Sequence, residues 1–285
     1  MTTPDGAVEA PDPDPAAHYD RVTDAWRLLL GESLHYGVFD TGSESLPAAT
    51  DALTARMIAG ARLAPGVRVL DVGCGTGDPA VHLVTTQDVD VVGITTSAVG
   101  VERATARAAA AGVAGRATFE VRDGTDNGLP DESFDRCWVL ESSHLMPARE
   151  ALIAECARVL RPGGRIVLCD LIRRRDIPFG ELRKRSREFA VLREAFGEAR
   201  MDPLDDYVAL AEKNGLVVDV ADDLTDLTLP TFERWRANAT DNHDEVVALI
   251  GEQALEAFVD AADILEAFWR DGTLGYGLFA AAKPA

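Results

Sequence analysis

The sequence of 285 residues has little basic charge, with 28 Lys and Arg against 48 Asp and Glu and a formal net charge of −20 at pH 7. A surface this acidic repels nucleic-acid backbones and anionic membrane surfaces, so we expect neither as a partner. Long apolar runs are also missing, because none approaches the ~20 residues that span a bilayer. These absences do not determine the oligomeric state, and a homo-oligomer is compatible with them.

Cysteine is scarce and scattered. Cys74, Cys137, Cys156 and Cys169 lack C-x-x-C spacing, so we predict neither a disulfide framework nor a zinc site, and no other metal site. Reduced thiols of this kind are typical of cytoplasmic proteins. A secretory signal or transit peptide needs a basic start, whereas the first fifteen residues are acidic and Pro-rich. We therefore expect a cytoplasmic protein in which residues 1–15 form a disordered tail.

From about residue 65 the sequence alternates short apolar strands with helices. Strands are expected at 67–72, 89–94, 117–122, 134–140, 165–170, 216–220 and near 273–281. Helices are expected from the N-cap Asp78 with Pro79, over 98–111 before the C′ glycine Gly112, from Pro147 to a stop at 161–164, and from 202–203 to 214–215. Buried strands that alternate with helices predict a doubly wound α/β sheet.

Two groups of helices do not fit this sheet. One is N-terminal, over 16–63, and the other comprises runs near 179–199 and 228–270. Both are placed to cover the carboxyl edge of the sheet, where ligands bind in such folds. The expected organisation is a tail (1–15), an N-terminal helical cover (16–64), a ligand-binding core (65–171) and the rest of the sheet with a helical lid (172–285).

A glycine loop, D-V-G-C-G-T-G at 71–77, connects the first strand to its helix. Gly73, Gly75 and Gly77 allow a tight turn and a close approach to a ligand. A dinucleotide fingerprint would need a further glycine where Asp78 follows Gly77, and an acidic residue where the second strand ends at Thr95. A phosphate loop is excluded, because no Gly-Lys-Ser/Thr follows.

Three segments together resemble the motifs of class I S-adenosylmethionine (SAM) dependent methyltransferases. They are the glycine loop, V-R-D-G-T-D-N-G-L-P-D-E-S-F-D (121–135) and V-L-R-P-G-G-R-I-V-L-C-D (159–170). This resemblance implies a seven-stranded Rossmann-like sheet in the order 3-2-1-4-5-7-6 with an antiparallel last strand. It also implies SAM as the cofactor, Asp71 near its amino group and Asp123 at its adenine. Within the core, the residues implied to bind the cofactor are Asp71, Gly73, Cys74, Gly75, Thr95, Asp123, Gly124 and Leu140.

Two further segments resemble a subgroup of this family. V-V-G-I-T-T-S (91–97) is similar to the corresponding segment of sterol, tocopherol and bacterial sugar methyltransferases, which also carry Gly-Ile-Thr or Gly-Ile-Ser there. In this chain Thr95 stands where many class I enzymes have the acidic residue that holds the ribose. The segment at 19–40 resembles their opening helix and a turn that folds over the cofactor. Tyr19, a predicted cofactor contact, and His35 and Tyr36 are candidate lid residues, with surface-helix packing as the alternative.

The segment L-E-S-S-H-L-M-P (140–147) follows the fourth strand, where the transferred methyl group would point. It resembles bacterial glycoside O-methyltransferases, which implies that His144 pairs with Asp170 at the end of the fifth strand. A hydroxyl is much less acidic than imidazolium, so an oriented histidine base would assist the transfer by about 10²–10⁴. Glu141 is the rival candidate: related carbon methyltransferases place a glutamate here, although a lid or cofactor contact is the simpler interpretation.

We therefore predict a SAM-dependent O-methyltransferase for a hydroxyl of a small-molecule secondary metabolite, glycosylated ones included. Carbon methylation through Glu141 and a SAM-binding cyclase or binding module on the same fold remain alternatives. Arg173–Arg175 and the run 183–187 are interpreted as solvated cations paired with Glu, or as contacts to a phosphorylated substrate. The apolar series from Ile250 to Trp269 predicts either a pocket wall or core packing.

Overall fold

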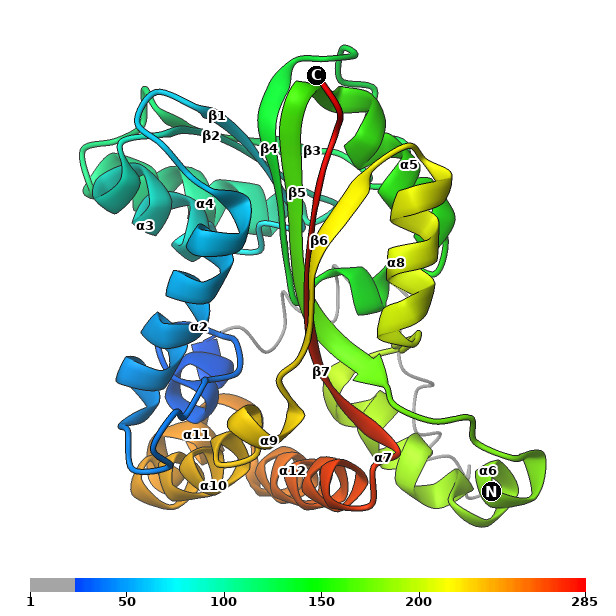
Figure 1. Cartoon of the computed structure of the whole chain (residues 1–285). Coiled ribbons are helices and arrows are strands. Elements are labelled where there is room, and N and C mark those ends of the chain that lie inside the picture. Colours follow the sequence, from blue (N-terminus) through cyan, green and yellow to red (C-terminus); the bar gives the residue numbers. More distant parts are fainter. Residues whose placement is uncertain (1–23) are drawn as a thin grey trace, which may run out of the picture.

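The computed structural model describes residues 24–285, so the predicted tail 1–15 and Tyr19 lie outside the described residues. Seven strands form one sheet in the order β3-β2-β1-β4-β5-β7-β6, which confirms the predicted topology (Figure 1). Their bounds are β1 Arg68–Val72, β2 Asp90–Thr95, β3 Ala117–Val121, β4 Phe134–Leu140, β5 Leu160–Arg173, β6 Val217–Asp223 and β7 Leu274–Ala282.

The direction of the strands follows the connections between them. β3, β2, β1, β4 and β5 pair in parallel: helices connect β1 to β2, β2 to β3 and β4 to β5, and a long loop connects β3 to β4. β7 pairs antiparallel with β5 on one side and with β6 on the other, as predicted for the last strand. The carboxyl ends of the five parallel strands therefore meet at one edge of the sheet.

Helices cover both faces of the sheet (Figure 1). One face carries α2 (Leu46–Ala61), α3 (Asp78–Gln87) and α4 (Ala98–Ala110), and the other carries α5 (Arg149–Val159) and α8 (Leu204–Lys213). Alternate strand residues separate the two cores: Trp138 and Val167 join the α2 side, whereas Cys137 and Ile166 join the α5 side. Both strand faces are apolar because both are buried.

Two local predictions need correction. Asp78 is not the N-cap of α3, because Gly77 takes that position at φ +81° and the Asp78 carboxylate binds Arg107 at 3.0 Å. The segment 161–164 neither ends the helix nor separates it from the strand, since α5 ends at Val159 and β5 already begins at Leu160. Backbone hydrogen bonds of Gly163 and Gly164 with Lys283 extend the pairing there and explain the longer strand.

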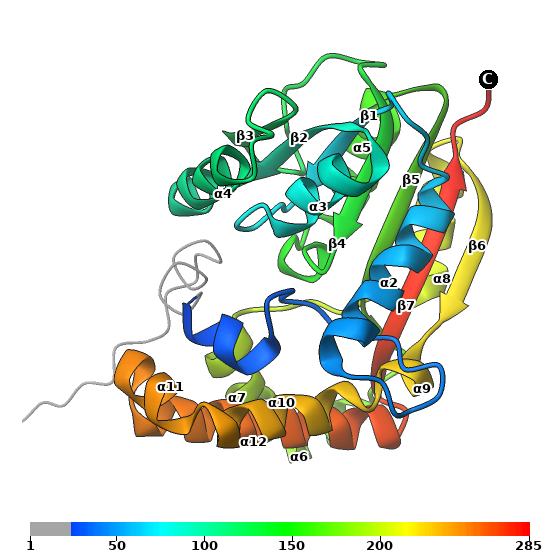
Figure 2. The same ribbon diagram turned by 90° about the vertical axis from the view of Figure 1, so that its left-hand side faces the viewer.

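The remaining helices lie at the carboxyl edge of the sheet. They are α6 (Phe179–Lys184), α7 (Ser186–Phe196), α9 (Thr225–Thr228), α10 (Thr231–Asp241), α11 (His243–Ile250), α12 (Glu252–Arg270) and a helical segment at 24–30. Figure 2 shows α10, α11 and α12 lying together across this edge, with the 24–30 segment between them and the sheet. Asn238 and Asn242 fasten that segment by donating to the backbone oxygens of Leu29 and Leu28, both at 3.0 Å. We call this assembly the cover.

Candidate active site

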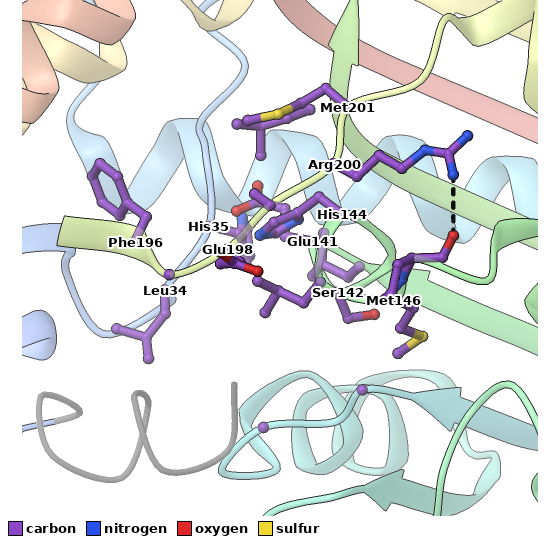
Figure 3. Close-up of a pocket in the computed structure, with 18 of the residues that line it drawn as sticks. Leu34, His35, Glu141, Ser142, His144, Met146, Phe196, Glu198, Arg200 and Met201 are labelled. Atoms are coloured by element: carbon purple, nitrogen blue, oxygen red, sulfur yellow. Dashed lines mark hydrogen bonds between the residues drawn. The ribbon is translucent and has the colours of Figure 1, made fainter. Parts of the chain in front are cut away.

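A cavity of about 1230 Å³ lies between the carboxyl edge of the sheet and the cover. The loops after β1, β2, β3 and β4 line it on the sheet side, and the 24–30 segment, α7, the loop at 197–201 and α12 line it on the cover side. Figure 3 shows Ser142 and Met146 on one side of this space and Phe196 and Met201 on the other. Of the predicted cofactor residues, Gly73, Cys74, Gly75, Thr95, Asp123, Gly124 and Leu140 line the cavity.

The glycine loop packs directly against the loop after β4. Gly73 has φ +80°, and a Cβ atom there would lie 2.2 Å from the Cβ of Ser142. Ser142 is fixed in turn, because its hydroxyl donates to the oxygen of Val72 at 2.7 Å. Only glycine satisfies both the backbone angle and the close approach at position 73. The glycine loop and the loop after β4 are thus held together.

Asp71 lies beneath this loop with an unsatisfied carboxylate. Its side chain is buried, and Oδ2 has no hydrogen-bond partner within residues 24–285. Desolvation raises the pKa of Asp71 to about 7. Unlike the glycines of the loop, Asp71 does not itself line the cavity. An ammonium group that reached Oδ2 past the glycine loop would supply the missing partner, which is the chemistry that the amino end of SAM offers.

The other cofactor candidates have polar atoms engaged in local turns. Asp123 Oδ1 accepts from Thr125 N at 2.8 Å and from Thr125 Oγ1 at 2.7 Å, which leaves Oδ2 for a ligand. A Cβ on Gly124 would lie 2.7 Å from Val72, so this glycine is also required by packing. Thr95 Oγ1 accepts from Ser97 N at 3.3 Å at the start of α4. The end of β2 therefore offers a hydroxyl and no carboxylate to a ribose.

His144 and Asp170 lie together although 26 residues separate them. His144 is on a 3₁₀ turn, Ser143–Leu145, after β4, and its Nδ1 is 2.7 Å from Asp170 Oδ1. Asp170 is fully buried and also accepts from the backbone N of His144 at 3.0 Å. Burial alone would raise the pKa of Asp170, but the facing imidazole and the hydrogen bonds hold it below its usual range.

The hydrogen bond to Asp170 fixes the tautomer of His144. A carboxylate only accepts, so Nδ1 carries the proton and Nε2 holds a lone pair. His144 lines the cavity, and Figure 3 places it between Glu141 and the crossing loop that carries Arg200 and Met201. The arrangement presents a basic nitrogen to whatever occupies the cavity beside the cofactor residues.

Glu141 connects three parts of the chain. It has φ +45°, and its Oε1 accepts from Tyr36 N at 2.8 Å and from the hydroxyl of Tyr276 on β7. Burial raises the pKa of Glu141 to about 8. These contacts favour the interpretation of Glu141 as a residue that holds the N-terminal turn over the site. Sequence reasoning missed Tyr276, which has no motif around it.

The two other N-terminal candidates have different surroundings. His35 lines the cavity, with Nδ1 2.9 Å from the oxygen of Tyr36. The Tyr36 ring stacks on Trp269 at 5.5 Å with an interplanar angle of 3°, inside a cluster of buried aromatic rings. Tyr36 also lines the cavity, so its side chain belongs both to this aromatic cluster and to the cavity wall, and its backbone supplies the contact to Glu141.

The cover side of the cavity is mainly apolar. Its lining includes Leu171, Phe189, Phe196, Met201, Trp235 and Leu265. Of the C-terminal apolar series, Leu255, Phe258, Phe268 and Trp269 are buried in the core, whereas Leu265 also reaches the cavity. Many of the basic residues noted in the sequence are paired with acids, as Arg174 with Asp223, Arg175 with Glu181, and Arg185 with Glu188.

Residues 24–285 contain neither a metal-ligand cluster nor a membrane-spanning helix. No group of three His, Cys, Asp or Glu side chains within 24–285 is arranged to hold a metal ion. Over the same residues, no helix combines the length and apolar character that crossing a membrane requires.

The sheet order, the glycine loop and the cavity above it define a class I SAM-dependent methyltransferase. The chain belongs to the mycolic acid cyclopropane synthetase family, whose sequence profile matches residues 10–274. It is 38% identical to the 27-O-demethylrifamycin SV methyltransferase of Amycolatopsis mediterranei over 93% of this chain and 95% of that protein. Relatives of this kind are O-methyltransferases of secondary metabolism.

Two solved structures extend the comparison. The [4+2]-cyclase SpnF superposes with a TM-score of 0.80 and 26% identity, over 95% of this chain and 96% of that chain. The mycolic acid cyclopropane synthase CmaA1, complexed with S-adenosylhomocysteine (SAH), superposes with a TM-score of 0.84 and 22% identity, over 94% and 96% of the two chains. The second likeness shows the shared fold.

Proposed function

We propose that this methyltransferase transfers the methyl group of SAM to a hydroxyl oxygen of a bulky secondary metabolite, with His144 as the general base. The observation that supports this most strongly is the oriented His144–Asp170 pair on the wall of the cavity. When bound, SAM supplies a methyl group on a sulfonium whose thioether is a good leaving group. The chain has to position the acceptor and remove its proton.

The protein groups divide these tasks between the two sides of the cavity. The glycine loop, Asp71, Asp123 and Gly124 would hold the cofactor on the sheet side. The apolar cover would exclude water and position the acceptor against Nε2 of His144, which accepts the hydroxyl proton. Asp170 stays ionised and stabilises the imidazolium that forms.

The cavity indicates the kind of acceptor. Ligand sites commonly measure about 300–1,000 Å³, and this cavity of about 1230 Å³ leaves considerable space beside the cofactor. Its cover side is apolar, which suits a large hydroxylated polyketide or a glycosylated metabolite. The relative that acts on 27-O-demethylrifamycin SV supports a place in antibiotic biosynthesis. Four buried, unbridged cysteines support a cytoplasmic location, and a homo-oligomer stays a prediction.

The test combines the purified protein, methyl-labelled SAM and a panel of hydroxylated macrocycles that includes 27-O-demethylrifamycin SV. We expect SAH and a labelled product whose methyl carbon has the chemical shift of an O-methyl group. A labelled carbon bonded to carbon would instead support transfer assisted by Glu141. Acceptor conversion without SAH would support a cyclase, the activity for which SpnF is named.

A further inference from the structure

The carboxylate of Asp170 has a second set of partners on the side away from the cavity. The hydroxyl of Ser143 donates to Oδ2, and Ser143 Oγ is 2.9 Å from the hydroxyl of Tyr207 on α8. Asp170, Ser143 and Tyr207 are all fully buried. Since Ser143 gives its one proton to the carboxylate, Tyr207 must be the donor in the next bond.

Tyr207 is itself held in a fixed orientation. The guanidinium of Arg149 lies 5.1 Å from the centre of its ring, and the ring of Phe279 lies 6.0 Å away on β7. Arg149 donates to the oxygen of Arg200 at 2.7 Å. The backbone N of Arg200 donates to the oxygen of His144 at 2.8 Å, which closes a ring of contacts around the pair.

We propose that Ser143 and Tyr207 are positioning residues that act through Asp170, and that they set both the orientation and the basicity of His144. This inference rests on the proposed role of His144 as the base. The backbone N of Leu171 also donates to Asp170 Oδ1, at 2.7 Å. A carboxylate that accepts four hydrogen bonds is held in one rotamer and has part of its charge neutralised by the donors. Without the hydroxyl pair it would attract the imidazolium more strongly and orient the ring less well.

Other charged and titratable groups surround the pair and must be included in any pH argument. Glu141 lies on the same loop and is bound by Tyr36 and by Tyr276 of β7. The remaining groups are Arg149 on α5, Tyr207 on α8, Arg200 on the crossing loop, the buried Asp202, which binds both arginines, and the thiol of Cys169 on β5. The substitutions below change neither Glu141 nor either arginine, so a shift in titration reports the hydroxyl pair.

The test is an NMR titration of the His144 ring in the SAH complex, with its signal assigned by its loss in His144→Gln. In Ser143→Ala we expect the titration midpoint to rise by about half to one pH unit, because Asp170 loses one charge-stabilising donor. Tyr207→Phe should shift it in the same direction by less. Because Tyr207 acts through Ser143, the double variant should match Ser143→Ala alone.

Activity and a matched control complete the experiment. With an acceptor that the wild type methylates, the acid limb of kcat in each variant should move by the same amount as the NMR midpoint of that variant. SAH affinity should stay within twofold of the wild type. Ser133→Ala removes a hydroxyl that binds Pro130 at the opposite end of β4, and it should move neither quantity. Tyr207→Phe keeps the ring and its packing, so it serves if Ser143→Ala fails to fold.

Two results would overturn the inference. One is a midpoint that is unmoved in both single variants, and the other is a Tyr207→Phe shift that persists in the Ser143→Ala background. A His144→Ala variant with full activity would instead contradict the proposed function, while the NMR titration would still decide whether the hydroxyl pair acts on His144.

Discussion

Asp71 is a residue whose ionisation opposes folding of the ligand-free chain. Burial raises its pKa to about 7, above the ~3.9 of an unfolded chain. A carboxyl group with a raised pKa stabilises the fold fully below about pH 4, and this stabilisation is lost as the pH rises through 7. A bound ammonium group would reverse the effect by pairing with the charge.

Asp71→Asn should remove this pH dependence. The unfolding free energy of the wild type relative to the variant should fall by on the order of 4 kcal/mol between pH 4 and pH 8, since three pKa units correspond to that amount. SAM affinity should drop at least tenfold at pH 8, because the charge-assisted hydrogen bond is lost. Denaturant unfolding at both pH values and calorimetry measure the two effects. Parallel pH profiles of wild type and variant would show that Asp71 stays ionised in the fold.

At the scale of elements, Glu141 joins the N-terminal turn to β4 and β7 through one carboxylate oxygen. Glu141→Gln keeps an acceptor for Tyr36 N and for the Tyr276 hydroxyl, so methyl transfer should remain within about threefold of the wild type. Glu141→Ala leaves both donors unpaired and should weaken SAM binding by about tenfold, a loss of about 1.4 kcal/mol.

Steady-state transfer and SAM calorimetry on the two variants separate the interpretations of Glu141. A glutamine variant that binds SAM normally and transfers nothing would show that the carboxylate takes part in the chemistry, as the carbon-methylation alternative requires.

The sequence predicted the sheet because the strands are short apolar runs separated by Gly and Pro signals, and motif I lies at the first turn. It also indicated His144 and Asp170 through the resemblance to glycoside O-methyltransferases: His144 follows β4, and Asp170 lies near the carboxyl end of the neighbouring β5. Tyr207 could not be found, because 64 residues separate it from Ser143 and no motif marks α8. The predicted strand 165–170 is shorter than β5. At its start, Gly163 and Gly164 pair with Lys283, just beyond β7, and so distant a partner is not visible in the local sequence.

At the scale of the whole molecule, the cover and the sheet share one continuous apolar core. Residues of the 24–30 segment, α10 and α12 belong to the same buried cluster as Trp138 and Val167 of the sheet. The division at residues 64 and 171 therefore stays a prediction. Helices from three separate parts of the chain partly enclose the cavity, so we expect the cover to open further when the cofactor and acceptor exchange.

Hydrogen exchange should detect this opening. In the ligand-free protein we expect the 24–30 segment, the turn at 34–36 and α10 to exchange faster than β1, β4 and β5, and SAH should slow them by about tenfold or more. The central strands serve as the internal control, because their exchange reports global unfolding. Equal protection of the cover with and without SAH would indicate that it does not open on ligand exchange.

The measurement that tests the central claim most directly is the single-turnover rate of methyl transfer by His144→Ala as a function of pH, with an acceptor that the wild type methylates. We predict a rate at least tenfold lower at neutral pH, no acid limb, and SAH affinity within twofold of the wild type, because only the base is removed. The wild type should lose rate on the acid side as the His144–Asp170 pair takes up a proton. A variant that transfers methyl at the wild-type rate, with the wild-type pH profile, would contradict the assignment of His144 as the base.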